Sequence, residues 1–322
     1  MPMTHKVLID CDPGVDDALA LMLAHGSPEL DVLAVTTCGG NQTLEKVTRN
    51  ALSLPDELGK DWIPVAAGAQ RPLVREPLTA GHVHGDTGLG LVELPDPQHA
   101  LDERHAVEVI AQTVLTHAPG EVTIIATGPL TNLALAIRQY PEIVERVHEV
   151  VLMGGGVTTG NLTPVAEFNI AVDPEAARAV FTAGWPVTMV GLDTTHQALA
   201  TPEVEAQFAA LGTRLGQIAV ELIRSYRDAY KHNQAFENPP CHDPVAVARV
   251  IAPELVSVRR APVDVELRGE LTTGQTVVDL RGSAPEDCAT AVATGLDHGG
   301  FWALVVDAVR NLGAPTPHGK QA

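Results

Sequence analysis

The hydrophobic positions of the first two hundred residues alternate between short, continuous apolar runs and longer helical patterns. The apolar runs predict buried strands at residues 6–9, 33–37, 63–67, 122–126, 150–153 and 187–192. Helical spacing between the runs predicts helices at residues 18–25, 44–54, 104–117, 130–138 and 174–183. Strands without polar alternation, separated by helices, are typical of a parallel sheet covered on both faces. The pattern therefore predicts an α/β fold with an open, mostly parallel, doubly wound (Rossmann-like) sheet flanked by helices.

The C-terminal part of the chain follows a different pattern. Helices are predicted at residues 203–231, 244–250 and 301–311, and a strand at 289–296. Segments 256–268 and 275–280 predict a small extra β-hairpin near the C-terminus, turning around Thr273 and Gly274. Because no repeat or Pro/Ser linker divides the chain, we expect a single domain over residues 1–312 and a frayed tail at 313–322.

One stretch, residues 71–97, is rich in Gly and Pro and has little periodicity. Long irregular loops in compact domains are usually functional. The segment is therefore expected to form a lid over a site, and a tolerated surface insertion is the alternative.

Composition narrows the range of functions. The chain has 322 residues, of which 45% are hydrophobic, and its net charge is −19. This charge repels phosphate backbones, and 5 Phe, 3 Trp and 3 Tyr offer little base stacking, so a small-molecule partner is expected rather than nucleic acid. No apolar run approaches the ~18 residues of a membrane span, and no signal peptide is evident. The four scattered cysteines suit free thiols, so we expect a cytoplasmic protein.

Four carboxylates, those of Asp10, Asp12, Asp16 and Asp17, follow the first predicted strand within eight residues. Ligands of open α/β sheets bind beyond the carboxyl ends of the strands. Helix capping explains one or two of these acids but not four, and their mutual repulsion favours a bound cation. Oxygen ligands without neighbouring zinc-type Cys or His spacing favour Ca²⁺ or Mg²⁺.

Two further clusters carry candidate chemistry. Asp243 precedes a helix and is either its N-cap or a ligand, and His242 beside it could act as a general acid. Glu167, Phe168 and Asn169, with Asn161 upstream, could bind sugar hydroxyls. The chain lacks a P-loop, a GxGxxG fingerprint and a GxSxG elbow, which disfavours nucleotide-phosphate or NAD binding and α/β-hydrolase chemistry.

These blocks resemble the nucleoside hydrolases, and most closely their inosine-uridine preferring branch. The resemblance is carried, in order, by DCDPGVDDA (10–18), GNQT (40–43), TAGHVHG (79–85), ATGPLTN (126–132), VVLMGGG (150–156), AEFNIAVDPEAA (166–177), MVGLDTTHQA (189–198) and CHDPVAVA (241–248). It implies hydrolysis of the N-glycosidic bond of ribonucleosides such as inosine and uridine, and a homodimer or homotetramer.

Site roles follow from the resemblance. It implies a Ca²⁺ ion held by Asp12, Asp17, the backbone carbonyl of Thr127, and Asp243, with Asp10 hydrogen-bonding these ligands from behind. Asp12 would be the general base on a calcium-bound water, and His242 the general acid for the leaving base. The ribose would be held by Asp16, Asn41, Asn161, Glu167 and Asn169, with Met153 beneath it. The base pocket would be lined by His84, Phe168, Tyr226 and Tyr230.

Several alternatives stay open. Where protozoan members carry an Arg four residues after the second pocket Tyr, this chain has Gln234, so a pyrimidine-specific ribonucleoside hydrolase is the first alternative. An aspartate-nucleophile phosphatase and a non-catalytic calcium-binding module are the others. We expect His82, His105 and His196 to be structural, and Cys11 or Cys241 to confer sensitivity to thiol reagents.

Overall fold

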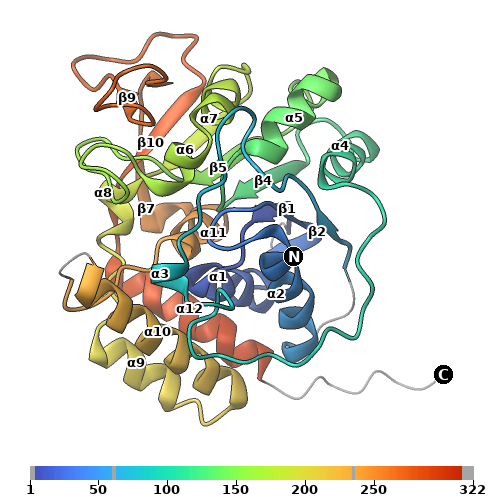
Figure 1. The fold of residues 1–322 in the computed structure, drawn as a ribbon, viewed down its shortest axis with the longest axis vertical. Coiled ribbons are helices and arrows are strands. Elements are labelled where there is room, and N and C mark those ends of the chain that lie inside the picture. The colour runs from blue at the N-terminus through green and yellow to red at the C-terminus, as the bar shows by residue number, and fades with distance from the viewer. Residues whose placement is uncertain (1–3, 60–62, 234–235, 314–322) are drawn as a thin grey trace.

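An eight-stranded sheet lies at the centre of the computed structural model, which describes residues 4–59, 63–233 and 236–313 (Figure 1). The strand order is β3-β2-β1-β4-β5-β6-β10-β7, and every pair is parallel except β10 and β7. The predicted doubly wound α/β fold is therefore confirmed. The strands are β1 (His5–Cys11), β2 (Leu30–Thr37), β3 (Val65–Ala67), β4 (Val122–Ala126), β5 (Glu149–Met153), β6 (Val187–Val190), β7 (Val256–Arg260) and β10 (Thr290–Leu296).

The two faces of the sheet are buried in separate hydrophobic cores, because neighbouring residues of a strand point to opposite sides. In β1, Val7 and Ile9 belong to one core, and Leu8 to the other. The first core is covered by α1 (Val15–Gly26), α2 (Leu44–Glu57), α9 (Pro202–Ala209), α10 (Arg214–Asn233), α11 (Asp243–Ile251) and α12 (His298–Leu312). The second is covered by α4 (Ala106–Thr116), α5 (Thr131–Gln139) and α7 (Pro174–Phe181).

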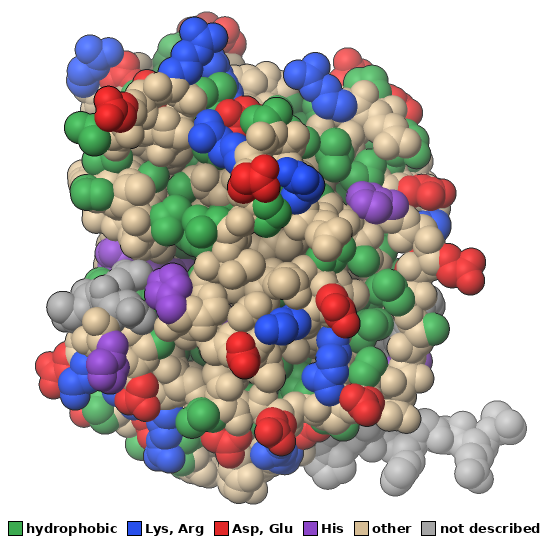
Figure 2. Space-filling model, in the orientation of Figure 1, with side chains coloured by type: hydrophobic (Ala, Val, Ile, Leu, Met, Phe, Trp, Pro, Cys, Tyr) green, Lys and Arg blue, Asp and Glu red, His purple; other side chains and the backbone are tan. Residues whose placement is uncertain are grey.

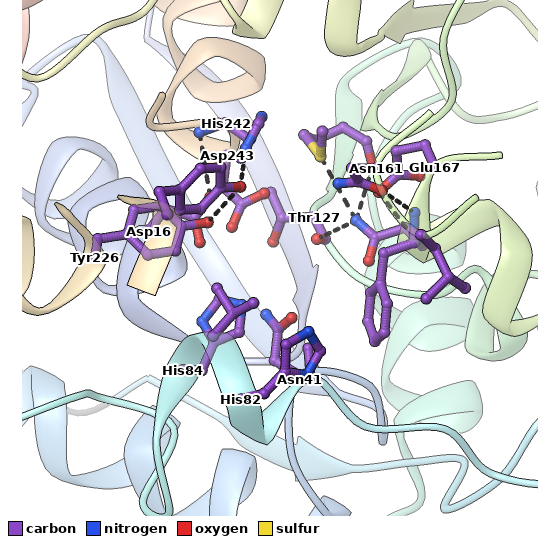
Figure 3. A pocket seen from close by; sticks show the side chains of 17 residues that line it. Asp16, Asn41, His82, His84, Thr127, Asn161, Glu167, Tyr226, His242 and Asp243 are labelled. Atoms are coloured by element: carbon purple, nitrogen blue, oxygen red, sulfur yellow. Dashed lines mark hydrogen bonds between the residues drawn. The ribbon is translucent and has the colours of Figure 1, made fainter. Parts of the chain in front are cut away.

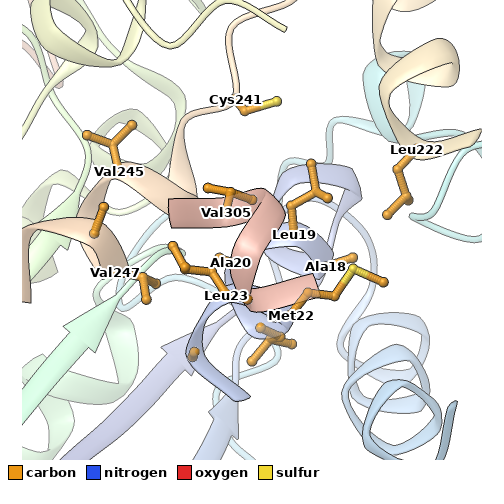
Figure 4. Close-up of a cluster of buried hydrophobic side chains, with 14 of the residues drawn as sticks. Ala18, Leu19, Ala20, Met22, Leu23, Leu222, Cys241, Val245, Val247 and Val305 are labelled. Atoms are coloured by element: carbon orange, nitrogen blue, oxygen red, sulfur yellow. The ribbon is translucent and has the colours of Figure 1, made fainter. Parts of the chain in front are cut away.

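Helix α1 is buried on almost every side. Leu19, Met22 and Leu23 are fully enclosed, and α1 packs against α11 and α12 (Figure 4). The sequence predicted a start near residue 18, but α1 begins at Val15 because the Asp17 carboxylate accepts a hydrogen bond from the Gly14 N–H at 2.9 Å. This earlier start brings the acidic residues into the first turn of the helix.

The predicted hairpin near the C-terminus forms over a shorter length. Only β8 (Val263–Val265) pairs with β9 (Thr276–Val278), as a two-stranded antiparallel sheet. Residues 256–260 instead form β7 at the edge of the main sheet. Pro262 separates the two pieces, since it has no N–H with which to continue a ladder.

The predicted helix at 203–231 is two helices, α9 and α10. Gly212 between them adopts φ +64°, which a helix cannot continue through. The Thr213 hydroxyl then accepts a hydrogen bond from the Gly216 N–H and opens α10. The predicted strand at 187–192 likewise ends at Val190, and Leu192–Thr195 forms the short helix α8.

Irregular segments contain short elements that the sequence did not predict: α3 (Gly81–His84), α6 (Phe168–Val172) and the 3₁₀ helices Pro141–Ile143 and Pro253–Leu255. Acidic and basic side chains are interspersed on the face shown in Figure 2. Among the described residues, every helix is too short or too polar to cross a bilayer. Positions 234 and 314–322 lie outside the described residues, so the expectations for Gln234 and most of the tail stay predictions.

Candidate active site

The strand order reverses between β1 and β4, and the segments that follow these two strands meet at one pocket. In doubly wound sheets this switch point opens the crevice in which ligands bind. Elements far apart in the chain close the pocket, with α3 and α10 on one side and the start of α6 on the other (Figure 3). Many residues singled out by the sequence line this pocket: Asp16, Asn41, His84, Thr127, Met153, Asn161, Glu167, Phe168, Asn169, Tyr226, Tyr230, His242 and Asp243.

Asp10, Asp12 and Asp17 lie beneath the pocket rather than in its wall, and each is at most 1% exposed. Burial raises the pKa of Asp10 to about 7 and that of Asp12 well above its ordinary value. The neighbouring Asp17 carboxylate raises the pKa of Asp12 further. Asp16 shows the same two causes, burial first, and its pKa is raised to about 7. A cation among these groups would favour their charged forms and so oppose the rise in their pKa values.

The residues fit a hard cation. Asp16, Asp17 and Asp243 each offer a carboxylate oxygen within 4.8 Å of the others, a grouping found among the described residues. Asp12 Oδ1 is buried and has no hydrogen-bond partner among the described residues, so it is an acceptor available to a ligand. The ligand set implied by the resemblance contains Asp12, whereas this grouping contains Asp16. Asp16 lies beside Asp17 in the first turn of α1. Oxygen donors alone suit Ca²⁺ or Mg²⁺.

Glycines allow the backbone to approach Asp12 closely. A Cβ on Gly40 would lie 2.1 Å from Asp12 Oδ2, and one on Gly128 would lie 2.7 Å from Oδ1. The Asn41 N–H donates to Asp12 Oδ2 at 2.6 Å. Side chains larger than hydrogen at positions 40 and 128 would therefore displace this carboxylate.

Asn132, for which the sequence suggested no role, holds Asp10. Its Nδ2 donates to Asp10 Oδ1 at 2.8 Å and to the carbonyl of Thr37 at 3.0 Å, and its Oδ1 accepts from the Ala69 N–H. Thr36 Oγ1 donates to the same Asp10 oxygen. Asp10 is thus oriented by β2 and the start of α5.

The Glu167 carboxylate is the N-cap of α6. It accepts hydrogen bonds from the N–H groups of Asn169, Ile170 and Gly155 at 2.8, 3.1 and 2.9 Å. Burial raises its pKa to about 7, although these hydrogen bonds act in the opposite direction. Asn169 Nδ2 donates to the Thr127 carbonyl at 2.9 Å, which ties α6 to the end of β4. The Glu167 side chain therefore both caps α6 and lines the pocket.

The opposite wall contains a row of hydrogen-bonded polar groups. Tyr230 O–H lies 2.6 Å from His242 Nε2 and 3.5 Å from the Tyr226 hydroxyl. His242 is buried at the start of α11, and burial lowers its pKa well below the ordinary value. His84 Nδ1 accepts a hydrogen bond from the Val15 N–H. These rings form a wall that is both aromatic and polar.

Comparison with known proteins identifies the family and supports the fold. The family model described as inosine-uridine preferring nucleoside hydrolase matches residues 7–303. The chain belongs to the inosine-uridine preferring nucleoside hydrolase family. The enzyme of that name from Crithidia fasciculata is 51% identical over 97% of this chain and 100% of that protein. The pyrimidine-specific ribonucleoside hydrolase RihA from Citrobacter koseri is 44% identical over 95% and 98% of the two chains.

A solved structure agrees with this assignment. The purine-preferring ribonucleoside hydrolase from Gardnerella vaginalis superposes with a TM-score of 0.90 at 33% identity, over 96% of this chain and 99% of that one. These relatives of this nucleoside hydrolase family member are all named as nucleoside or ribonucleoside hydrolases. The phosphatase and non-catalytic alternatives have no support among them.

The structure changes the expectation for one histidine. His82, expected to be structural, lines the pocket together with Ala80, Val83 and Leu162, which the sequence did not single out. Its place two residues before His84, on the same short helix, was the available signal. His105 is structural as expected, since its Nδ1 accepts from the Val107 N–H at the start of α4. His196 contacts the His242 ring, with 5.8 Å between ring centroids, and stands outside the pocket lining.

The segment 71–97, predicted to be a lid, contributes α3 to the pocket and is fastened at several points. Arg75 forms an ion pair with Glu175, whose Oε1 lies 2.7 Å from Nη2. The Leu73 N–H donates to the buried Asp173 carboxylate, and the Leu91 N–H donates to Ser225 Oγ. Movement of this segment stays a prediction.

Proposed function

We propose that this protein hydrolyses the N-glycosidic bond of ribonucleosides, inosine and uridine among them, to the free base and ribose. One observation carries the proposal. A buried carboxylate cluster, in which Asp12 Oδ1 has no hydrogen-bond partner among the described residues, adjoins a pocket with one wall built from Tyr226, Tyr230 and His242. The carboxylates suit the sugar side of the bond that breaks, and the tyrosine and histidine wall suits the base.

A Ca²⁺ ion is proposed to be held by four groups: the carboxylates of Asp12, Asp17 and Asp243, and the carbonyl oxygen of Thr127. The ion would supply positive charge that orients the sugar hydroxyls and lowers the pKa of a water. Asp16, which groups with Asp17 and Asp243, is proposed to bind the ribose from the same cluster.

Each chemical requirement of the reaction has a residue. Asp12 Oδ1 is free to accept the proton of the attacking water, because Oδ2 already accepts from Asn41. The ribosyl group gains positive charge as the base leaves, and buried carboxylates stabilise that charge. His242 is proposed as the general acid: Nε2, on the side where Tyr230 lies, gives its proton to the departing base and regains one from solvent, to which Asp12 releases the proton of the attacking water.

A reducing-sugar assay with added Ca²⁺ tests the proposal on inosine, uridine and cytidine. The wild-type protein is expected to release ribose, and Asp12→Ala to lower kcat by at least ~10²-fold, the lower end for loss of a general base. Asp287→Ala removes an exposed carboxylate and is the matched control, expected to leave kcat unchanged. Absence of ribose release from every nucleoside by the wild type would refute the proposal.

A pyrimidine-specific ribonucleoside hydrolase is the second candidate, favoured by the 44% identity to RihA. The ratio of kcat/KM for inosine to that for uridine decides between the two. A ratio below about 10⁻² corresponds to more than about 2.7 kcal/mol of discrimination and would establish the pyrimidine-specific function.

A further inference from the structure

His242 is held between two hydroxyl groups. Thr195 Oγ1 lies 2.7 Å from Nδ1, and Tyr230 O–H lies 2.6 Å from Nε2. Both nitrogens of the ring are thus engaged, and His242 is buried. A neutral imidazole carries one proton, so one nitrogen donates and the other accepts. The direction in which the two hydroxyls point decides which nitrogen carries it.

One direction satisfies every donor in this row. If Thr195 donates to Nδ1, Nε2–H donates to the Tyr230 oxygen, and the Tyr230 O–H can turn to the Tyr226 oxygen at 3.5 Å. Tyr226 in turn interacts with the Asp16 carboxylate, which offers an acceptor at the end of the row.

The opposite direction leaves a proton without an acceptor. Were Nδ1 to donate to Thr195, the threonine hydroxyl would need another acceptor. Within the part of the chain that the structure describes, the Thr195 hydroxyl makes no hydrogen bond besides that with His242, and its residue is 0% exposed. A buried hydroxyl proton without an acceptor carries an uncompensated desolvation penalty, so this direction is unfavourable.

We propose that Thr195 is a positioning residue: its hydroxyl donates to Nδ1 of His242 and keeps the ring proton on Nε2, the nitrogen that faces the pocket residue Tyr230. Thr195 itself does not line the pocket, so it acts through His242. The inference rests on the proposed function, in which Nε2–H of His242 donates to the leaving base and regains from solvent the proton that it gives up. Thr195 follows β6 in the short helix α8, 47 residues before His242.

The neighbouring residue supplies a matched control. Thr194 Oγ1 is also buried, but it has no hydrogen-bond partner in the part of the chain that the structure describes. Thr→Val replaces a hydroxyl by a methyl group of similar size, so the same substitution at two adjacent positions separates the loss of the hydrogen bond from the change in packing.

Thr195→Val is expected to lower kcat for inosine or uridine by about 10- to 100-fold, the usual effect of losing the partner that orients a functional histidine. KM is expected to stay within about twofold, because Thr195 does not contact the substrate. Thr195→Ser, which keeps the hydroxyl, is expected to restore most of kcat, and Thr194→Val to match the wild type. Equal kcat values for Thr195→Val and Thr194→Val would overturn the proposal.

A second measurement is independent of activity. The ¹⁵N NMR shifts of the His242 ring are expected to show Nδ1 unprotonated and Nε2 protonated in the wild type, and a mixture of tautomers in Thr195→Val. A proton on Nδ1 in the wild type would overturn the proposal even if Thr195→Val failed to fold. If the wild type released no ribose from any nucleoside, the proposed function would fail, and the ring spectrum would still decide the role of Thr195.

Discussion

The backbone N–H of Val15 donates a hydrogen bond to Nδ1 of His84, with 3.1 Å between the two nitrogens. Val15 is the first residue of α1, so its N–H belongs to the positive end of the helix dipole. The bond leaves the ring proton on Nε2. Burial, with a smaller contribution from repulsion by His82, lowers the pKa of His84 to about 3. His84 is therefore a neutral N–H donor whose orientation is set by the protein.

The first prediction concerns the protonation of this ring. The ¹⁵N shifts of His84 are expected to show protonated Nε2 and unprotonated Nδ1, and to stay constant between pH 5 and 8. His84→Phe keeps an aromatic ring beside Tyr226 but removes the donor, and it is expected to lower kcat/KM about fivefold, the worth of one neutral hydrogen bond. Titration of the His84 ring within this pH range would contradict the assignment.

A second prediction concerns Gly14, over which two pocket side chains meet. A Cβ at this position would lie 2.4 Å from His84 Nδ1 and 2.7 Å from Asn41 Nδ2. Gly14→Ala is therefore expected to displace both side chains and to lower kcat/KM at least about tenfold, as small misplacements of positioning groups do. Gly282→Ala is the control, because its Cβ would have no atom within 4 Å. Equal activity of the two variants would show that the pocket tolerates the displacement.

A third prediction links stability to pH in the metal-free protein. The pKa values of Asp10, Asp16 and Glu167 are each raised to about 7, chiefly by burial, from ordinary values of 3.8, 3.8 and 4.5. The folded protein then keeps protons that the unfolded chain has already lost. The resulting stabilisation is complete below about pH 4 and is lost as the pH rises through about 7. In EDTA, Tm is expected to fall between pH 5 and 8, and a Tm that rises over this range would contradict it.

A bound cation should reverse this trend, because it binds the deprotonated carboxylates and releases their protons. Ca²⁺ at 100 times its Kd is expected to stabilise the fold by about 2.7 kcal/mol, and the gain in Tm should be larger at pH 8 than at pH 6. Asp12→Asn is expected to lose most of this gain. K⁺ at matched ionic strength is the control, and an equal gain with K⁺ would mean that charge screening alone stabilises the cluster.

A fourth prediction concerns the thiols, and it reverses what the sequence suggested. Cys11, Cys38 and Cys241 are buried, and burial raises their thiol pKa values well above the ordinary value. Cys288 is partly exposed. Because alkylation requires an accessible thiolate, the folded protein is expected to take up one iodoacetamide, at Cys288, and to keep its activity. Loss of activity in step with modification of Cys11 or Cys241 would restore the earlier expectation.

Local sequence determined most of the sheet. The central parallel strands β1, β4, β5 and β6 are mostly apolar and buried, so the local pattern predicts them without knowledge of distant residues. The acidic residues after β1 could be found in the same way, because four carboxylates in eight residues are unusual at the end of a strand. The division at Pro262 and the turn at Gly212 were missed, since strand and helix periodicity continue across them and only the backbone geometry breaks.

By itself the sequence determined the strands, the helices and the residue types that the chemistry needs, because these depend on neighbours along the chain. The tertiary structure alone decided how those side chains are paired. His84 meets Val15 across 69 residues, and His242 meets Thr195 across 47. Such hydrogen bonds depend on burial and on angles that exist only once the sheet has brought its strand ends together. For that reason, the protonation and orientation of the groups in the site follow from the fold.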